Sequence, residues 1–183
     1  MSLLVALMFS AMTTVPRERA VLIYPRERAW FRRAFYNRHQ KALQRELQER
    51  FAVEVYDQVA TDEALFAIEV RGANLLVLSG HGCPYAISLN GRHGRTLDES
   101  DQARLKAFLS QLAPDATIIL QSCYTGLGFA RIVKKAAGSG RRVIAAEGQI
   151  PPDGVVITSL APIDVAITCR DDHGRPWNCK VRL

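Results

Sequence analysis

Two short apolar runs, each ending in small residues and one reactive side chain, constrain the fold of this chain most. Residues 75–82 read Leu-Leu-Val-Leu-Ser-Gly-His-Gly, and residues 118–126 read Ile-Ile-Leu-Gln-Ser-Cys-Tyr-Thr-Gly. Apolar runs of this length bounded by glycine are typical of strands buried on both faces. Neighbouring strands of an open parallel sheet deliver their carboxyl ends to the same crevice. If these two strands are neighbours, His81 and Cys123 therefore meet there, although they are far apart in the sequence.

Strand-like and helix-like patterns alternate along the rest of the chain. Short β-branched runs predict further strands at 19–25, 51–56, 142–146, 155–158 and 165–168. Helical spacing of apolar residues predicts helices over about 27–50, 61–70, 96–112 and 126–137. This alternation predicts an α/β fold with a mainly parallel sheet flanked by helices. The length fits a single domain over 1–183, with 151–183 supplying the last strands.

The predicted helices carry recognisable end signals. Thr61 or Asp62 can cap the second helix, and Thr96 with Glu99 fits a capping box at the start of the third. Gly138 suits the carboxyl end of the last helix. In the first helix, the apolar stripe consists of Phe31, Phe35, Leu43 and Leu47.

Composition indicates an ordinary globular chain with a basic balance. Hydrophobic residues make up 48% and charged residues 23%, and the formal net charge is +6. Acidic residues are interspersed with the arginines and no aromatic stripe alternates with them, so nucleic-acid binding is not expected. A regulatory anion bound by Lys134, Lys135, Arg141 and Arg142 is an alternative that rests on charge alone.

The first fifteen residues are apolar but do not fit a standard targeting segment. The run is too short to span a bilayer. A secretory signal also places positive charge before its apolar core, and here only the α-amino group precedes it. A cytoplasmic location is therefore favoured, and export through this segment stays open.

The four cysteines fall into two pairs of different character. Cys83 and Cys123 each lie beside a glycine-rich strand end. Cys169 and Cys179 flank a turn-rich run at 171–174, which predicts a hairpin that brings the two thiols close together. With His173 they would supply only three loosely spaced zinc ligands, so no metal site is predicted. No cofactor is predicted either.

The two strand ends carry the groups that nucleophilic catalysis requires. A free thiol titrates near pH 8.5, so a nucleophilic cysteine needs activation at neutral pH. His81 can accept or hold the proton of Cys123, and a helix beginning near Gly126 would point its partial positive charge at the sulfur. The N–H groups of Gly82 and Cys123 can form an oxyanion hole. These residues suffice for acyl transfer.

The same residues resemble the signature of the clan CD cysteine peptidases, the caspase-like family. That signature is an apolar strand ending in His-Gly, followed by an apolar strand ending in an acidic residue or Gln, a small residue and Cys. Here it reads Ser79-Gly80-His81-Gly82 and Gln121-Ser122-Cys123, and the following Tyr-Thr-Gly is similar to the Cys-x-x-Gly motif of CHAT domains. The resemblance covers about 20–146. It implies a three-layer caspase-like fold and a cysteine endopeptidase acting on a protein or peptide substrate.

By the same resemblance, Cys123 is the nucleophile and His81 the general acid or base, while Ser79 and Gln121 line the pocket for the residue before the scissile bond. Departures from the pattern leave the specificity of this pocket open. Tyr124 stands where caspases have Arg, and Gln121 stands where metacaspases have Asp, so neither an acidic nor a basic substrate residue is implied. Glu147, Asp153 or Asp164 is a candidate for a charge in the pocket. The main alternative function is a catalytically silent caspase-like module that binds another protein.

Overall fold

The computed structural model describes residues 17–26, 40–90, 96–151 and 153–183, and its centre is a six-stranded sheet. The strand order is β12-β8-β7-β3-β1-β2, and all neighbours pair in parallel except β12, which runs antiparallel to β8. The strands are β1 (Glu18–Pro25), β2 (Phe51–Val59), β3 (Leu75–Ser79), β7 (Thr117–Gln121), β8 (Arg142–Ala146) and β12 (Lys180–Arg182). The predicted mostly parallel α/β sheet is thus confirmed.

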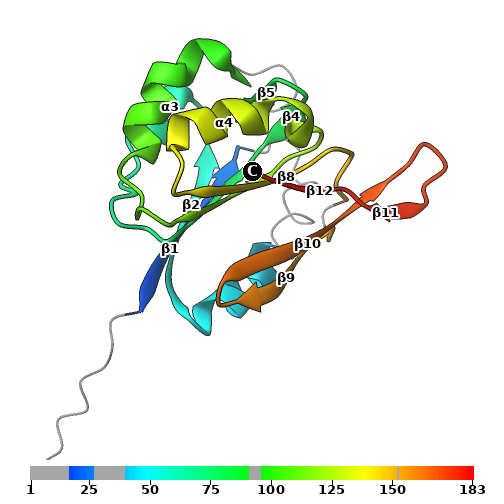
Figure 1. Ribbon diagram of the computed structural model, residues 1–183, viewed down its shortest axis with the longest axis horizontal. Helices are drawn as coiled ribbons and strands as arrows, with labels where there is room; N and C mark the ends of the chain where they lie inside the picture. Colours follow the sequence, from blue (N-terminus) through cyan, green and yellow to red (C-terminus); the bar gives the residue numbers. More distant parts are fainter. Residues whose placement is uncertain (1–16, 27–39, 91–95, 152) are drawn as a thin grey trace, which may run out of the picture.

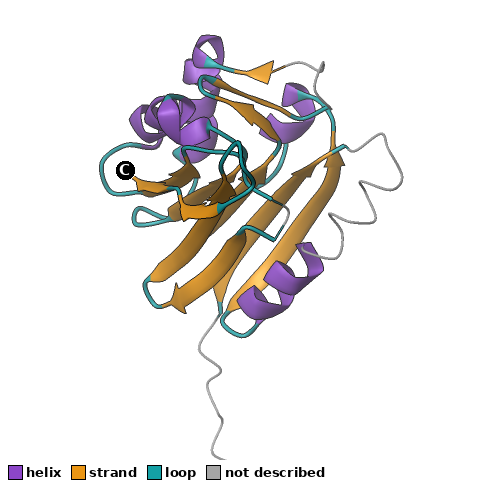
Figure 2. Cartoon of the chain, turned by 90° about the vertical axis from the view of Figure 1, so that its right-hand side faces the viewer, coloured by secondary structure: helices purple, strands orange, loops and turns teal. Residues whose placement is uncertain are grey.

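Both faces of this sheet are covered, and each has its own hydrophobic core (Figures 1 and 2). Alternation along β1 shows the division, because Val21 and Ile23 belong to one core and Leu22 and Tyr24 to the other. The first core is closed by α2 (Asp62–Phe66), α3 (Gln102–Leu109) and α4 (Phe129–Ala137). The second is closed by a helix over 40–48 and by the strands β9 (Val155–Leu160) and β10 (Ile163–Arg170).

Two small antiparallel sheets accompany the main sheet. One consists of β4 (His81–Cys83), β5 (Ala86–Ser88) and β6 (Thr96–Leu97). The other consists of β9, β10 and β11 (Pro176–Asn178). Figure 1 shows the β10–β11 hairpin as an arm that projects beyond the main sheet. Of these antiparallel pairings, the sequence predicted the β10–β11 hairpin.

Local signals explain where most elements begin and end. Thr61 caps α2, because its Oγ1 accepts the N–H of Ala64 at 3.1 Å, and Gly138 ends α4 with a φ of 85°. The predicted capping box at Thr96 and Glu99 is wrong. Thr96 lies in β6, and the box forms two residues later, at the 3-10 helix η1 (Glu99–Asp101), with Asp98 as the N-cap.

Two predicted boundaries near the candidate site also differ. The strand expected to run as far as His81 ends at Ser79, and His81 opens the separate strand β4. The helix expected from 126 is preceded by a 3-10 helix, η2 (Thr125–Leu127), and α4 begins only at Phe129. In the first predicted helix, Leu43 and Leu47 are buried as expected, while Phe31 and Phe35 lie outside the described residues, as do residues 1–15.

Candidate active site

The carboxyl ends of β3 and β7 lie side by side, as the two apolar runs predict. Their parallel register pairs Leu75 with Thr117 and ends at the pair Ser79 and Gln121. At that last pair the Ser79 hydroxyl donates a hydrogen bond to Gln121 Oε1 at 2.8 Å. Both predicted pocket residues therefore meet, and they present an uncharged hydrogen-bonded pair.

Gly82 brings the His81 strand against the Cys123 turn. A Cβ atom on Gly82 would lie 2.2 Å from the carbonyl oxygen of Cys123 and 2.9 Å from its nitrogen. Only a glycine permits this approach of two backbones, because real Cβ atoms do not come within 3.0 Å of such neighbours. The backbone contact thus joins Cys123 itself to Gly82, the residue that directly follows His81.

The two reactive side chains are both half-buried. The Nε2 atom of His81 is shielded from solvent, and β4 is held in place by pairing with β5, in which His81 faces Ser88. The sulfur of Cys123 lies 3.9 Å from the carbonyl oxygen of Ile150. Cys83, at the end of β4, is exposed.

The turn after Cys123 differs from the simple strand-to-helix junction predicted for it. Tyr124 has a left-handed backbone with a φ of 59°, a conformation uncommon outside glycine. The first amide of α4, that of Phe129, donates to the carbonyl oxygen of Pro84 at 2.6 Å. The helix terminus predicted to face the thiol is thus separated from Cys123 by η2, and its first N–H group binds the β4–β5 turn.

A loop that sequence reasoning missed, 147–150, lies between Cys123 and the C-terminal hairpin. On one side, the Tyr124 N–H donates to Gly148 O at 3.0 Å, and Ile150 O faces the Cys123 sulfur. On the other, the N–H of Arg170 donates to Gln149 O at 3.1 Å and that of Glu147 to Cys179 O at 3.0 Å. These contacts use backbone atoms, so side-chain patterns gave no signal for them; only the position of the loop after a buried strand did.

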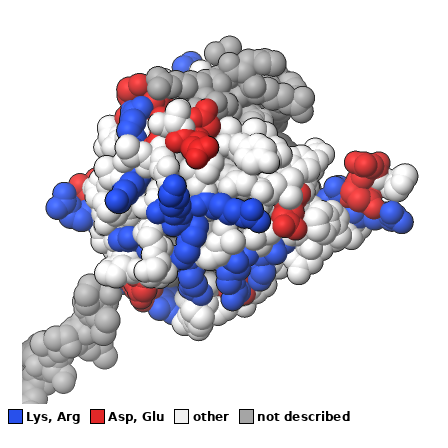
Figure 3. Space-filling view, turned by 45° about the horizontal axis from the view of Figure 1, so that its top comes forward, with Lys and Arg blue, Asp and Glu red and all other residues white. Residues whose placement is uncertain are grey.

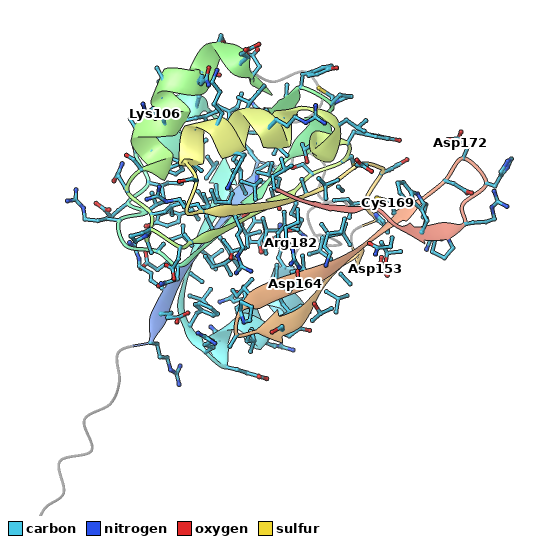
Figure 4. The ribbon with its side chains drawn as sticks, in the orientation of Figure 1. Lys106, Asp153, Asp164, Cys169, Asp172 and Arg182 are labelled. Carbon is cyan, nitrogen blue, oxygen red and sulfur yellow. A yellow bond between two sulfur atoms is a disulfide. The ribbon has the colours of Figure 1, made fainter. Side chains whose placement is uncertain are left out.

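Cys169 and Cys179 form a disulfide across the β10–β11 hairpin, with Cα atoms 5.8 Å apart (Figure 4 labels Cys169). The predicted hairpin with adjacent thiols is confirmed. Both cysteines are buried, and the Cys169 sulfur packs against Gly148 of the 147–150 loop. Among the described residues no group of three or more His, Cys, Asp or Glu side chains is placed to hold a metal ion.

Of the three acidic residues considered for the pocket, Asp164 forms ion pairs with two basic side chains of β12. Arg182 lies 2.6 Å from its carboxylate and Lys180 lies 3.3 Å away (Figure 4). Burial raises the pKa of Asp164, but hydrogen bonds from Arg182, the Val165 amide and Lys180 outweigh this and hold the pKa below its ordinary value. Glu147 and Asp153 are exposed.

Part of the positive charge has a structural role. Figure 3 shows a band of Lys and Arg side chains on one face. Within the candidate anion-binding set, Arg141 donates to four carbonyl oxygens, those of Ser110, Leu112, Ala113 and Ala137. Lys134 donates to the carbonyls of Ser139 and Arg141, and Arg142 to the Thr117 hydroxyl. Two of these carbonyls, those of Ser110 and Ala137, lie at the carboxyl ends of α3 and α4, where the last carbonyl groups of a helix have no hydrogen-bond donor within it. Arg141 supplies that donor.

Comparison with known protein families and with curated proteins found no match to this chain. None of the helices in the described part of the chain has the length and apolar character needed to cross a membrane.

Proposed function

We propose that this chain is a cysteine endopeptidase of the caspase-like class, with Cys123 as nucleophile and His81 as general acid and base. The observation that carries the proposal is the contact of Gly82 with the Cys123 backbone, which puts the residue after the histidine against the nucleophile's own peptide group. The mostly parallel sheet covered on both faces is compatible with a three-layer caspase-like fold.

The proposed reaction is acyl transfer followed by hydrolysis. The Cys123 sulfur attacks the carbonyl carbon of the scissile peptide bond, and His81 takes the thiol proton. The N–H groups of Gly82 and Cys123 stabilise the oxyanion of the tetrahedral intermediate. His81 then protonates the departing amine as the carbon–nitrogen bond breaks. Water then attacks the carbonyl carbon of the thioester while His81 takes one of its protons. The carbon–sulfur bond breaks, the carboxylic acid product leaves, and His81 returns the proton to the Cys123 sulfur.

Substrate selection in this proposal begins at Ser79 and Gln121. Their side chains are hydrogen-bonded to each other and carry no charge. The pocket for the residue before the scissile bond therefore favours an uncharged side chain, unless exposed Glu147 or Asp153 reaches it. This agrees with the departures of the sequence from caspases and metacaspases.

A covalent label tests the proposal directly. The purified chain is treated with a library of peptidyl acyloxymethyl ketones, and the modified residue is located by mass spectrometry. We expect modification at Cys123, its loss in Cys123→Ala, and a fall of about two to four orders of magnitude in labelling rate in His81→Ala.

Cys83→Ala is the matched control, since this thiol shares β4 with His81 and is the more exposed of the two cysteines outside the disulfide. It should keep most of the labelling and any peptide cleavage. Labelling that follows Cys83 instead, or none with any peptide, would overturn the peptidase proposal; the second result would favour the silent binding module.

A further inference from the structure

The exposed large apolar side chains of this protein gather around the Cys123 turn. Among the described residues six such side chains are more than a third exposed. Two of them, Val55 and Val156, lie on the outer strands β2 and β9. The other four come from loops and short elements next to Cys123: Tyr85, Tyr124, Leu127 and Trp177. We call these four side chains the aromatic rim. Apolar surface concentrated in this way marks a binding site more often than a random surface.

Tyr85 is fixed in position on one side of the turn. Its ring lies against Gly128, where an added Cβ would be 2.5 Å from Cδ1 of the tyrosine. The hydrogen bond from the Phe129 amide to Pro84 O holds the same loop in place. The ring nevertheless stays 68% exposed. Tyr85 therefore contacts the residue that directly follows Leu127 in the chain.

Trp177 is fixed on the other side in the same manner. The edge of its indole lies against Gly148, with Cζ2 2.9 Å from where a Cβ would be. Gly148 in turn accepts the amide of Tyr124, the residue that follows Cys123. The indole is 41% exposed on a strand whose three residues are all exposed. Tyr85 and Trp177 are thus each connected, through one glycine, to the segment that carries Cys123, Tyr124 and Leu127.

We propose that the aromatic rim binds apolar side chains of an extended polypeptide substrate on either side of the bond that Cys123 attacks. This inference rests on the proposed function and adds the substrate class. Rings already fixed against glycines lose little conformational freedom on binding, so most of the contact energy is available for affinity. The hydrogen-bonded Ser79–Gln121 pair adds no charge, and Asp164 is neutralised by Arg182 and Lys180. The site therefore discriminates by apolar contact.

The occupant is a polypeptide substrate because the rim is continuous with the proposed nucleophile. Tyr124 is covalently adjacent to Cys123, and the 147–150 loop that supports Trp177 also faces the Cys123 sulfur through Ile150. A ligand lying on the rim thus has its backbone beside the thiol. A second copy of this chain is the competing occupant, and the experiment separates the two.

The test uses the full chain with Cys123→Ala, so that binding is measured without turnover. Two short fluorescent peptides of equal charge, one carrying Phe and Leu and one carrying Ser and Gln in their place, are titrated by fluorescence anisotropy. We expect the apolar peptide to bind more tightly. Trp177→Ala and Tyr85→Ala should each weaken its binding by about fivefold to tenfold, while Trp177→Phe should keep most of it. Val55→Ala is the matched control, because Val55 is 39% exposed, close to the 41% of Trp177, and lies on β2, which β3 and β1 separate from the strand that precedes Cys123; it should change nothing.

Equal affinity for the two peptides, or an equal loss in Val55→Ala, would show that the rim is not a substrate site. So would a dimer, detected by light scattering, that becomes monomeric in Trp177→Ala, since the rim would then join two copies. The two proposals fail separately. Apolar binding without any covalent labelling of the wild-type chain removes the peptidase and keeps the rim, whereas labelling at equal rates by apolar and polar ketones removes only the rim.

Discussion

At the amino ends of the parallel strands, charged side chains connect neighbouring strands. At the carboxyl ends, uncharged residues connect them. Arg50 pairs with Glu18 at 2.7 Å, and Arg19 holds Glu54 through two hydrogen bonds of 2.7 and 2.8 Å. At the opposite end the links are the Ser79–Gln121 hydrogen bond and the close backbone approach at Gly82.

This difference in how neighbouring strands are linked bears on how much displacement each link tolerates. Long charged side chains at the amino ends tolerate small displacements because they are partly exposed and flexible. Close backbone approaches through glycine tolerate none, since a single added carbon would collide with a carbonyl oxygen. At the carboxyl ends such an approach, at Gly82, adjoins Cys123, so the proposed function there depends on that glycine.

The largest expected effect comes from placing a methyl group at each end of the sheet in turn. Gly82→Ala would put Cβ 2.2 Å from Cys123 O, and Gly140→Ala would put it 2.5 Å from Pro114 O near the start of β8. Both should lower the free energy of unfolding by about 1–3 kcal/mol, measured by urea denaturation. Only Gly82→Ala should reduce the rate of Cys123 labelling per folded molecule, by about a hundredfold, because it displaces the reacting groups. Equal rates in the two variants would mean that the Gly82 contact does not position the site.

A smaller effect on labelling is expected from the disulfide, which supports the carboxyl end indirectly. It closes a loop of 10 residues, so its removal in the double variant Cys169→Ala/Cys179→Ala should cost about 2–3 kcal/mol of unfolding free energy. Labelling of Cys123 should also slow, though less than in Gly82→Ala, because the 147–150 loop packs against Cys169. A reductant should reproduce both changes in the Cys83→Ala protein and add nothing to the double variant. An unfolding free energy unaffected by reduction would mean that the bridge does not form in solution.

The sequence predicted the strands at this end well and the loops around them poorly. Buried parallel strands need continuous apolar runs, so Leu75–Ser79 and Thr117–Gln121 could be recognised and expected to be neighbours. The 147–150 loop could not, because it contacts Cys123 through carbonyl oxygens, which every residue has. The helix α4 begins only at Phe129, directly after Gly128, which packs against the Tyr85 ring. These residues are distant in sequence, so no local pattern encodes their contact.

The smallest expected effect concerns the charged amino end and its dependence on pH. The hydrogen bond from Arg19 lowers the pKa of Glu54 below its ordinary value, in spite of partial burial that acts in the other direction. A carboxyl group whose pKa is lower in the folded than in the unfolded state stabilises the fold above its unfolded pKa. That contribution is lost as pH falls through the folded pKa. Since the Glu54 side chain is 43% exposed, solvent screening should limit the contribution to about 0.5 kcal/mol.

Glu54→Gln should therefore lower the Tm slightly at neutral pH and leave it unchanged in strong acid, where the wild-type carboxyl is protonated. Labelling of Cys123 should be the same in both proteins at neutral pH, because Glu54 lies away from the strand ends that carry the reactive groups. A change in labelling without a change in Tm would mean that the two ends of the sheet are coupled, and the comparison between them would no longer hold.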